Sequence, residues 1–432
     1  MDARRFRLAL AALALVGFGA RLAYGLVAHV PAGFGDDVWY HEVANGLVHG
    51  RGFSDPFNSL QGGRVVFGTF GDPIPTAFHP PLFPAVLAVA SAVGLESYTA
   101  HQVVGCALGA ATVPVVGLIG RRALDERAGV AAAAIAAVFI PMIARDSLLQ
   151  SESLYGLLIA LLLLAALRLH ERMTDRRALA LGVAAGLAAL TRWEAVLLAA
   201  LLVVPIAYRG ERGRRLRTVG LVVAAVAVLC APWCVRNSLV FDRPVQIATN
   251  DGSVFAGANL DSTYHGRGLG AWDYEGLFLV RPGLHVDRNE AVQAERWRDE
   301  GIDYARDHLG RLPVVIGARV LRTWGLYPFG PAARAGFASD QYRYVHALEY
   351  PSQLMLLAVL ALAAAGAVAL RRGRRLLWPL LAPLGLSVLV SAIAFGDPRF
   401  RASADVALVV LAGAGAALAF AALRQRSRTA ST

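Results

Sequence analysis

Long apolar runs separated by short polar links make up most of the 432-residue chain. Leu354–Leu370 and Val406–Leu423 carry no charged residue and approach the roughly 20 residues that an α-helix needs to cross a bilayer. The pattern predicts an all-α polytopic membrane protein with about ten transmembrane helices. These fall at about 7–29, 98–120, 127–144, 148–169, 177–191, 193–208, 216–235, 351–370, 375–395 and 403–423.

The apolar segment Pro80–Gly94 is only about 15 residues long, which is short for a full crossing. If it crossed, the Arg121 link and every later arginine cluster would face outward, against the rule that basic links stay in the cytoplasm. We therefore expect this segment to lie along the outer face or to re-enter it. Both termini and all six arginine clusters are then cytoplasmic; the clusters lie within 4–7, 121–127, 172–177, 209–217, 371–375 and 424–428.

This topology divides the chain into three parts. Residues 1–235 form an N-terminal transmembrane module, whose first extracytoplasmic loop covers 30–97. Residues 236–350 form a second extracytoplasmic loop, and residues 351–432 carry the C-terminal helices and a basic tail. The spans beside Thr191–Glu194 are short, so this turn either floors a cavity below the outer surface or reflects a thinned bilayer or an interfacial ion pair.

The distribution of charged residues along the chain agrees with this topology. The net charge of +11 rests on arginine alone, because the chain contains no lysine, and the arginines cluster in the links between apolar runs. This is the membrane-orientation pattern rather than a nucleic-acid surface. The three cysteines lack zinc-site spacing, and no nucleotide fingerprint stands in a strand–helix context. We expect a plasma-membrane protein with an extracytoplasmic site, no nucleic-acid partner and no required cofactor.

The polar stretch Gly35–Gly50 (GDDVWYHEVANGLVHG) places Asp36 and Asp37 at the expected start of a helix after the first span. The start of a helix stabilises an ionised carboxylate, which suits a catalytic base. At helical spacing Asp36 and Tyr40 share one face, and Asp37 and His41 share the neighbouring face. The structural alternative is that Asp36 caps the helix and Asp37 is a solvated acid of its first turn.

A base at the outer face needs an activated substrate that arrives through the membrane, and a lipid phosphate meets that need. The departing phosphate requires cations, and arginine suits bidentate phosphate binding better than lysine does. The candidates at the outer ends of the predicted spans are Arg145, Arg192, Arg236, Arg399 and Arg401.

Several short motifs resemble, in order, those of the membrane glycosyltransferases that use polyprenyl-phosphate sugars. That group includes the protein O-mannosyltransferases, the aminoarabinose transferase ArnT and the RgtA/B/C/D-like proteins, and its fold is called GT-C. The motifs are an acidic pair with aromatics (36–40), a glycine-rich step (50–53), HPPLFP (79–84), 145–152, TRWE (191–194), PWCVRN (232–237), 250–259 and DPRFR (397–401). They cover nearly the whole chain, and each alone is weakly specific.

The resemblance implies a GT-C fold and an inverting single displacement, in which an acid deprotonates the acceptor hydroxyl and polyprenyl phosphate leaves. Asp36 matches the first acid of the family pair and is the expected base, with Asp37 second, where the family often has Glu. His79 stands where ArnT-like members have lysine, and either donates to the lipid phosphate or caps the next helix. The residues expected to support these groups are Tyr40, His41, Glu194 and Asp397.

The partners implied are a polyprenyl-phosphate-linked hexose or pentose, a lipid, glycan or protein acceptor, and membrane lipids. One base and one phosphate cage suffice, although a divalent cation beside Asp36 and Asp37 is compatible with the sequence. The aromatics of the second loop, including Trp272, Tyr342 and Tyr344, serve membrane anchoring or sugar binding. Arg21, within the first span, either snorkels or pairs with the lipid phosphate.

Three alternatives remain, and one of them is a non-catalytic scaffold derived from the same fold. A lipid or solute transporter would have inverted repeats and broken helices at mid-membrane, and neither is clear in the sequence. An enzyme of the O-antigen ligase or polymerase type would carry its key residues mainly in the later loop, without an acidic pair after the first span.

Overall fold

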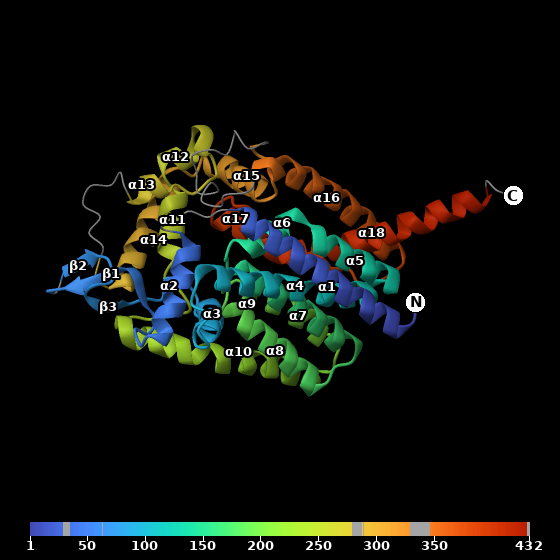
Figure 1. Cartoon of the computed structure of the whole chain (residues 1–432), viewed down its shortest axis with the longest axis horizontal. Coiled ribbons are helices and arrows are strands. Elements are labelled where there is room, and N and C mark those ends of the chain that lie inside the picture. Colours follow the sequence, from blue (N-terminus) through green and yellow to red (C-terminus); the bar gives the residue numbers. More distant parts are fainter. Residues whose placement is uncertain (29–34, 63, 279–286, 288, 329–345, 430–432) are drawn as a thin grey trace.

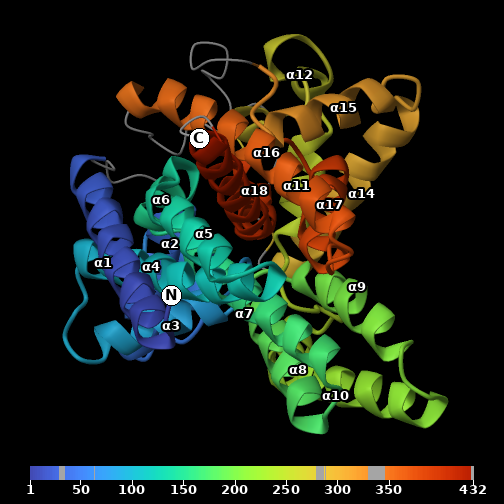
Figure 2. The same cartoon turned by 90° about the vertical axis from the view of Figure 1, so that its right-hand side faces the viewer.

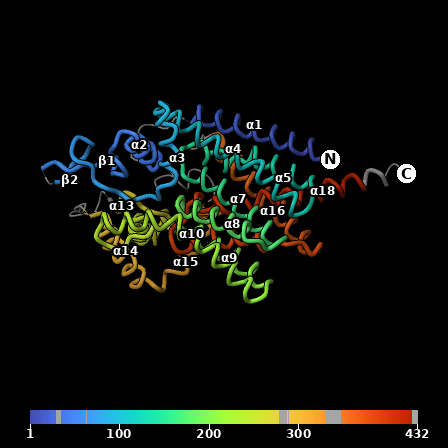
Figure 3. The backbone as a smooth tube through the Cα atoms, turned by 90° about the horizontal axis from the view of Figure 1, so that it is seen from below, coloured from blue at the N-terminus to red at the C-terminus, as the bar shows by residue number. Residues whose placement is uncertain are grey.

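The computed structural model describes residues 1–28, 35–62, 64–278, 287, 289–328 and 346–429. The molecule is elongated and mostly helical. Both termini lie at one end, and a small sheet and a group of short helices lie at the other (Figure 1). Helix α1 runs along one long side, and α9 lies on the opposite side (Figure 3).

Within the described residues, six helices are long and apolar enough to cross a membrane. A seventh span arises if α5 and α6, which are bent by 52° at Phe139, are counted as one. The six are α1 (Ala3–Val27), α4 (Tyr98–Ala123), α7 (Glu152–Glu171), α10 (Arg212–Phe241), α16 (Glu349–Arg372) and α18 (Ala402–Thr429), and the bent pair is α5 (Glu126–Val138) with α6 (Ile140–Ser147).

These seven coincide with seven of the ten predicted spans. The other three predictions fall on shorter helices, α8 (Asp175–Ala189), α9 (Ala195–Ala207) and α17 (Trp378–Ile393), which have 15, 13 and 16 residues. Segment Pro80–Gly94 contains α3 (Leu82–Ser91), whose 10 residues cover about 15 Å at 1.5 Å per residue. That length is half of a bilayer core of about 30 Å, so α3 is too short to cross, as expected.

The first large loop contains α2 (Asp36–Val48) and a three-stranded antiparallel sheet that the sequence analysis did not predict. The sheet has the order β2-β1-β3, with β1 (Ser54–Gln61), β2 (Arg64–Phe67) and β3 (Asp72–Pro75). Prolines inside β1 and β3 weaken the strand signal in the sequence. Gly50 and Gly52 both have positive φ, which allows the tight turn from α2 into β1.

The second large loop packs against the first. Its described elements are α11 (Asp251–Ala258), α12 (Asp261–Tyr264), η1 (Gly266–Gly268), α13 (Tyr274–Phe278), α14 (Glu290–Asp307), α15 (Leu312–Thr323) and η4 (His346–Leu348). Tyr342 and Tyr344 lie outside the described residues. Glu290, at the start of α14, accepts hydrogen bonds from Thr76 Oγ1 (2.5 Å), the Ala77 N–H (2.9 Å) and the Thr249 hydroxyl.

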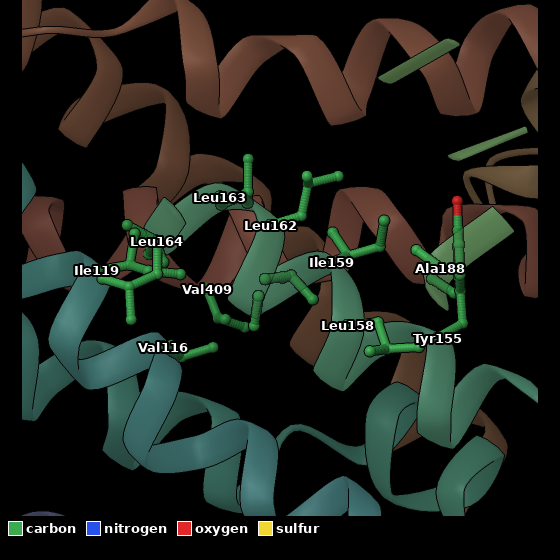
Figure 4. Packing of buried hydrophobic residues seen from close by; sticks show 14 of the residues in the cluster. Val116, Ile119, Tyr155, Leu158, Ile159, Leu162, Leu163, Leu164, Ala188 and Val409 are labelled. Carbon is green, nitrogen blue, oxygen red and sulfur yellow. The ribbon is translucent and has the colours of Figure 1, made fainter. Parts of the chain in front are cut away.

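The apolar core is centred on α7. Leu158, Ile159 and Leu162 are almost fully buried. They pack among Val116 and Ile119 of α4, Ala188 of α8 and Val409 of α18, which surround them (Figure 4). Helices α8, α9 and α10 form a separate group at the lower right of Figure 2. Helix α7 is thus enclosed by protein, which makes its first residue, Glu152, a buried carboxylate.

Arg21 takes neither of the two expected roles. Its side chain is fully buried between helices, and its Nε donates to Asp146 Oδ2 of α6 at 2.8 Å. Gly109 of α4 lies directly against this pair and leaves the space that the two side chains occupy. An ionised residue in a transmembrane helix is costly unless it is paired, and this ion pair meets that requirement inside the bundle.

Candidate functional site

Three segments far apart in the sequence meet at Asp36. Asp36 is the first residue of α2, preceded by the extended Gly35, and its carboxylate faces His79 and Arg399. His79 Nε2 lies 3.3 Å from Oδ1, and Arg399 Nη1 donates to Oδ2 at 2.6 Å. His79 precedes α3, and Arg399 lies in the turn η5 (Pro398–Arg401) before α18. The sequence analysis had placed all three residues in the site.

The electrostatics of the cluster favour the ionised form of Asp36. Burial, the largest influence, would raise the pKa of Asp36, but His79 and Arg399 together lower it well below its ordinary value. The position of Asp36 in the first turn of α2 adds the favourable field of the helix N-terminus. Asp36 is therefore a carboxylate at neutral pH, and its side chain remains a quarter exposed.

Asp37 points to a different neighbour. It accepts a hydrogen bond of 2.7 Å from the Tyr98 hydroxyl at the start of α4, and burial raises its pKa. His41, on the same face of α2, lies 3.0 Å from His101, from Nδ1 to Nδ1. Tyr40, on the face of Asp36, is fully buried, and its ring centroid lies 4.9 Å from that of His79. The predicted division of α2 into two faces is confirmed, and one acid faces the site.

Glu152 joins the predicted arginines and was missed as a site residue. Arg399 Nε and Arg192 Nη1 both donate to Glu152 Oε1, at 2.7 and 2.6 Å. Arg192 Nε also donates to Glu194 Oε1 at 2.6 Å, so Glu194 supports Arg192 as expected. The sequence did carry a signal for Glu152, because it is an acid at the head of a long apolar run.

Arg145 and Arg401 form the adjoining ionic cluster. Both pair with Asp405, which is fully buried in α18, at 2.8 and 2.7 Å. With Arg399 and Glu152 they line a cavity of about 60 Å³ that also reaches α16. Asp397 lines the same cavity and accepts from the Arg399 N–H at 2.8 Å, which caps η5. Three of the five predicted arginines therefore surround one small polar cavity beside Asp36.

Arg236 has a different role from the one expected. Its guanidinium donates to the backbone carbonyls of Thr76 (2.9 Å) and Phe53 (3.0 Å) and lies over the ring of Trp233. It therefore fastens the first loop onto α10, and none of its hydrogen bonds within the described residues goes to Asp36. The placement in a phosphate cage is not supported for Arg236.

The side chain of His79 is buried beside Asp36. Its side chain is 5% exposed, its Nδ1 lies 3.5 Å from Asn250 Nδ2, and its buried Nε2 lies 3.3 Å from Asp36 Oδ1. Trp39, Tyr40 and Phe78 surround the ring with centroid distances of 4.8–4.9 Å. The imidazole is thus held rigidly, with Nε2 directed at the Asp36 carboxylate.

A metal centre does not emerge from the described side chains. No group of three or more His, Cys, Asp or Glu residues among them has the geometry to hold a metal ion. Asp36 and Asp37, the pair considered for a divalent cation, are turned toward Arg399 and Tyr98 respectively. Of these two acids, Asp36 therefore contacts an arginine, whereas Asp37 contacts Tyr98.

The fold and the site together define a polytopic helical membrane protein in which acids and arginines meet where the two large loops join the helix bundle. Residues 78–235 match the profile of the family described as dolichyl-phosphate-mannose-protein mannosyltransferase. No curated protein sequence matches the chain significantly.

Solved structures share the overall fold. The oligosaccharyltransferase AglB from Archaeoglobus fulgidus, in complex with an inhibitory peptide and a dolichol-phosphate, matches 98% of this chain at 15% identity with a TM-score of 0.58. The apo form of the Archaeoglobus fulgidus oligosaccharyltransferase matches 99% of this chain at 14% identity, also with a TM-score of 0.58. This chain spans about half of each: 51% and 52%.

ArnT from Cupriavidus metallidurans bound to undecaprenyl phosphate matches 96% of this chain and 78% of its own at 16% identity, with a TM-score of 0.45. The likeness to the two oligosaccharyltransferase structures shows that the chain has a GT-C-like fold, as its motifs suggested.

Proposed function

We propose that this protein is a membrane glycosyltransferase that moves a hexose or pentose from a polyprenyl-phosphate donor to a hydroxyl acceptor at the extracytoplasmic face. The observation that carries the proposal is Asp36, an ionised carboxylate held between His79 and Arg399 beside an arginine-lined cavity. A base next to a set of phosphate-binding cations is the minimum that such a displacement requires. The family profile and the shared fold support the same reaction class.

In the proposed reaction, Asp36 accepts the proton of the acceptor hydroxyl, whose oxygen attacks the anomeric carbon of the donor sugar. The bond from that carbon to the phosphate oxygen breaks, the configuration inverts, and polyprenyl phosphate leaves as an anion. Arg399, with Arg145 and Arg401 across the cavity, stabilises the departing phosphate, and His79 Nε2 orients the carboxylate. Glu152 holds Arg192 and Arg399 in place.

The contact between Arg399 and Asp36 gives the donor a second role. A base with a strongly lowered pKa is a weak proton acceptor. When the donor phosphate takes over the Arg399 guanidinium, Asp36 loses one of the cations that lower its pKa, and its basicity rises. Asp36 then becomes a stronger base only when a donor is bound, so proton transfer to Asp36 is coupled to donor binding.

Transfer by the Asp36→Asn variant tests the proposal. The purified protein in lipid nanodiscs is given radiolabelled polyprenyl-phosphate hexoses and pentoses with an envelope extract as acceptor. We expect Asp36→Asn to lower the rate by about 10²–10⁴-fold, which is the usual contribution of a general base. Asp37→Asn is the matched control, because Asp37 contacts Tyr98, and we expect it to retain most of the rate.

Full activity of the Asp36→Asn variant would show that Asp36 is not the catalytic base. Absence of transfer from every polyprenyl-phosphate hexose and pentose by the wild type would instead favour a transporter, or a ligase that uses a different lipid-linked donor. The reaction as proposed needs no divalent cation, and the same assay with EDTA checks this point.

A further inference from the structure

A second cleft, of about 390 Å³, has in its wall Asn250, whose Nδ2 lies 3.5 Å from His79 Nδ1. It lies between the turn that joins α8 to α9 and the second large loop. Trp193 lines it from the turn, and the residues that line it from the loop include Arg243, Gln246, Asn250, Glu295 and Arg298. The function proposed above assigns no role to this cleft.

The lining combines one aromatic face with ordered polar groups. Trp193 is half exposed. Arg243 Nη1 donates to Glu295 Oε2 at 2.6 Å, and Arg298 donates from Nε and Nη2 to Asp251 Oδ2 at 2.8 and 2.7 Å. Each pairing fixes the direction of planar donors and acceptors before a ligand arrives, which lowers the entropic cost of binding.

This chemistry matches a sugar ring better than a peptide. A pyranose has an apolar C–H face that stacks on an indole, and hydroxyl groups that bond to carboxylate, guanidinium and amide side chains. A peptide would require an open strand edge or a row of apolar side-chain pockets. The cleft combines Trp193 and small apolar residues with charged and amide side chains, which is the mixture that the apolar face and the hydroxyl groups of a sugar ring require.

The cleft adjoins the reaction site at two points. Asn250, in its wall, lies against His79, whose other ring nitrogen faces Asp36. Trp193 follows Arg192, which shares Glu152 with Arg399. The Asn250 side chain in the wall of the cleft and the His79 ring therefore connect the cleft to the Asp36 carboxylate.

We propose that this cleft is a carbohydrate subsite that holds one sugar residue of the acceptor, stacked on Trp193. The designation as an acceptor subsite rests on the glycosyltransferase function proposed above, whereas sugar binding by itself does not. The acceptor is then a glycan or a glycolipid headgroup, and the contacts from Asn250 to His79 and from His79 to Asp36 connect the subsite to the base.

Saturation-transfer NMR on the full chain in nanodiscs tests the subsite without any reaction. The probes are the methyl glycosides of mannose, glucose, galactose and N-acetylglucosamine, together with a short serine- and threonine-containing peptide. We expect at least one glycoside to receive saturation through its C–H face. Trp193→Ala should lower that signal at least fivefold, and Trp193→Phe should keep most of it.

The matched control is Tyr208→Ala, which removes an exposed aromatic ring at the far end of α9. It should leave the signal unchanged. Asp36→Asn should also bind the glycoside normally even if it abolishes transfer, so the failure of one proposal is distinguishable from the failure of the other. The proposal is overturned if no glycoside receives saturation, if only the peptide does, or if Trp193→Ala binds like the wild type, which would leave Trp193 as a membrane anchor.

Discussion

Arg399 connects the charge of Asp36 to the cavity proposed for the lipid phosphate, and its removal should change the pH dependence of transfer. In the wild type the pKa of Asp36 lies well below its ordinary value, so kcat/KM should stay flat through mildly acid pH. Arg399→Gln takes away one cause of that lowering, so the pKa of Asp36 rises. The acid limb should then move upward into the measurable range, with a rate loss of about 10²-fold or more.

Arg145→Gln is the control for this measurement. Arg145 lines the same cavity but pairs with Asp405, so its loss should lower the rate without moving the acid limb. An unchanged profile in Arg399→Gln would contradict the proposed coupling between Arg399 and Asp36.

The residues of the site were predictable to different degrees. Three site residues could be recognised because they stand in short motifs outside the apolar runs: Asp36, His79 and Arg399. The structure brings these three together. Glu152 was passed over because its importance arises from contacts with Arg192 and Arg399, which follow it by 40 and 247 residues. Arg236 was misplaced because residue type and side of the membrane do not show whether a guanidinium faces a cavity or a backbone carbonyl.

Close packing of α4 against the buried Arg21–Asp146 pair should make Gly109 intolerant of a side chain. A Cβ at Gly109 would clash with the Asp146 carboxylate and stand 2.6 Å from Arg21 Nε, so Gly109→Ala must separate or displace the pair. Disturbing a buried pair costs about 3–5 kcal/mol. We expect a clear fall in the midpoint of thermal unfolding in detergent.

The matched substitution is Gly156→Ala in α7, where no atom lies within 4 Å of the new methyl group. It should be neutral or stabilising by up to about 1 kcal/mol, because alanine is the better helix former. Equal destabilisation by both variants would show that the Arg21–Asp146 contact is not the reason.

The junction of the two loops should depend on the ionisation of Glu290. Burial raises the pKa of Glu290 above its ordinary value, although hydrogen bonds from Thr249, Thr76 and Ala77 oppose the shift. The folded protein then binds a proton that the unfolded chain has released. This contribution to stability is lost as the pH rises from the ordinary glutamate pKa through the raised one.

Glu290→Gln should therefore remove part of the stability loss that the wild type shows as the pH rises through that interval, as measured by thermal unfolding across pH. Glu295→Gln, an exposed acid in the same helix, should leave the slope unchanged. An identical slope in the wild type and Glu290→Gln would mean that this carboxylate titrates normally.

At the scale of elements, hydrophobic periodicity located the helices well and their lengths less well. Apolar residues continue across α8, α9 and α17, yet these helices have 15, 13 and 16 residues, because turns such as 191–194 interrupt hydrogen bonding without interrupting hydrophobicity. The three-stranded sheet was not predicted from the sequence for a different reason. Strands β2 and β3 have four residues each, β1 and β3 contain prolines, and the strands are stabilised by pairing with one another rather than by a periodic apolar face.

The whole molecule has a clear polarity along its length. Both termini lie at one end, and β1–β3, α13 and α14 lie at the other (Figure 1). Two of the arginine-rich links meet where α7 and α9 end, since Arg209 Nη1 donates to the His170 carbonyl at 2.8 Å and Arg217 Nη2 pairs with Asp175 at 2.5 Å. That the arginine links face the cytoplasm and the loops face outward stays a prediction.

Labelling of single cysteines in intact cells tests this orientation. In a background without Cys106, Cys230 and Cys234, a cysteine at Phe70, which is 92% exposed beside β3, should react with a membrane-impermeant maleimide. A cysteine at Gly213, which is exposed at the start of α10, should react only after the membrane is permeabilised.

The reverse pattern would place Asp36 and its arginines in the cytoplasm, where nucleotide-activated sugars are available. The reason for proposing a lipid-linked donor would then fall, even if Asp36 remained the base. Labelling at both positions without permeabilisation would mean that the arginine links do not set the orientation. The orientation experiment therefore tests the choice of donor, whereas Asp36→Asn tests the chemistry.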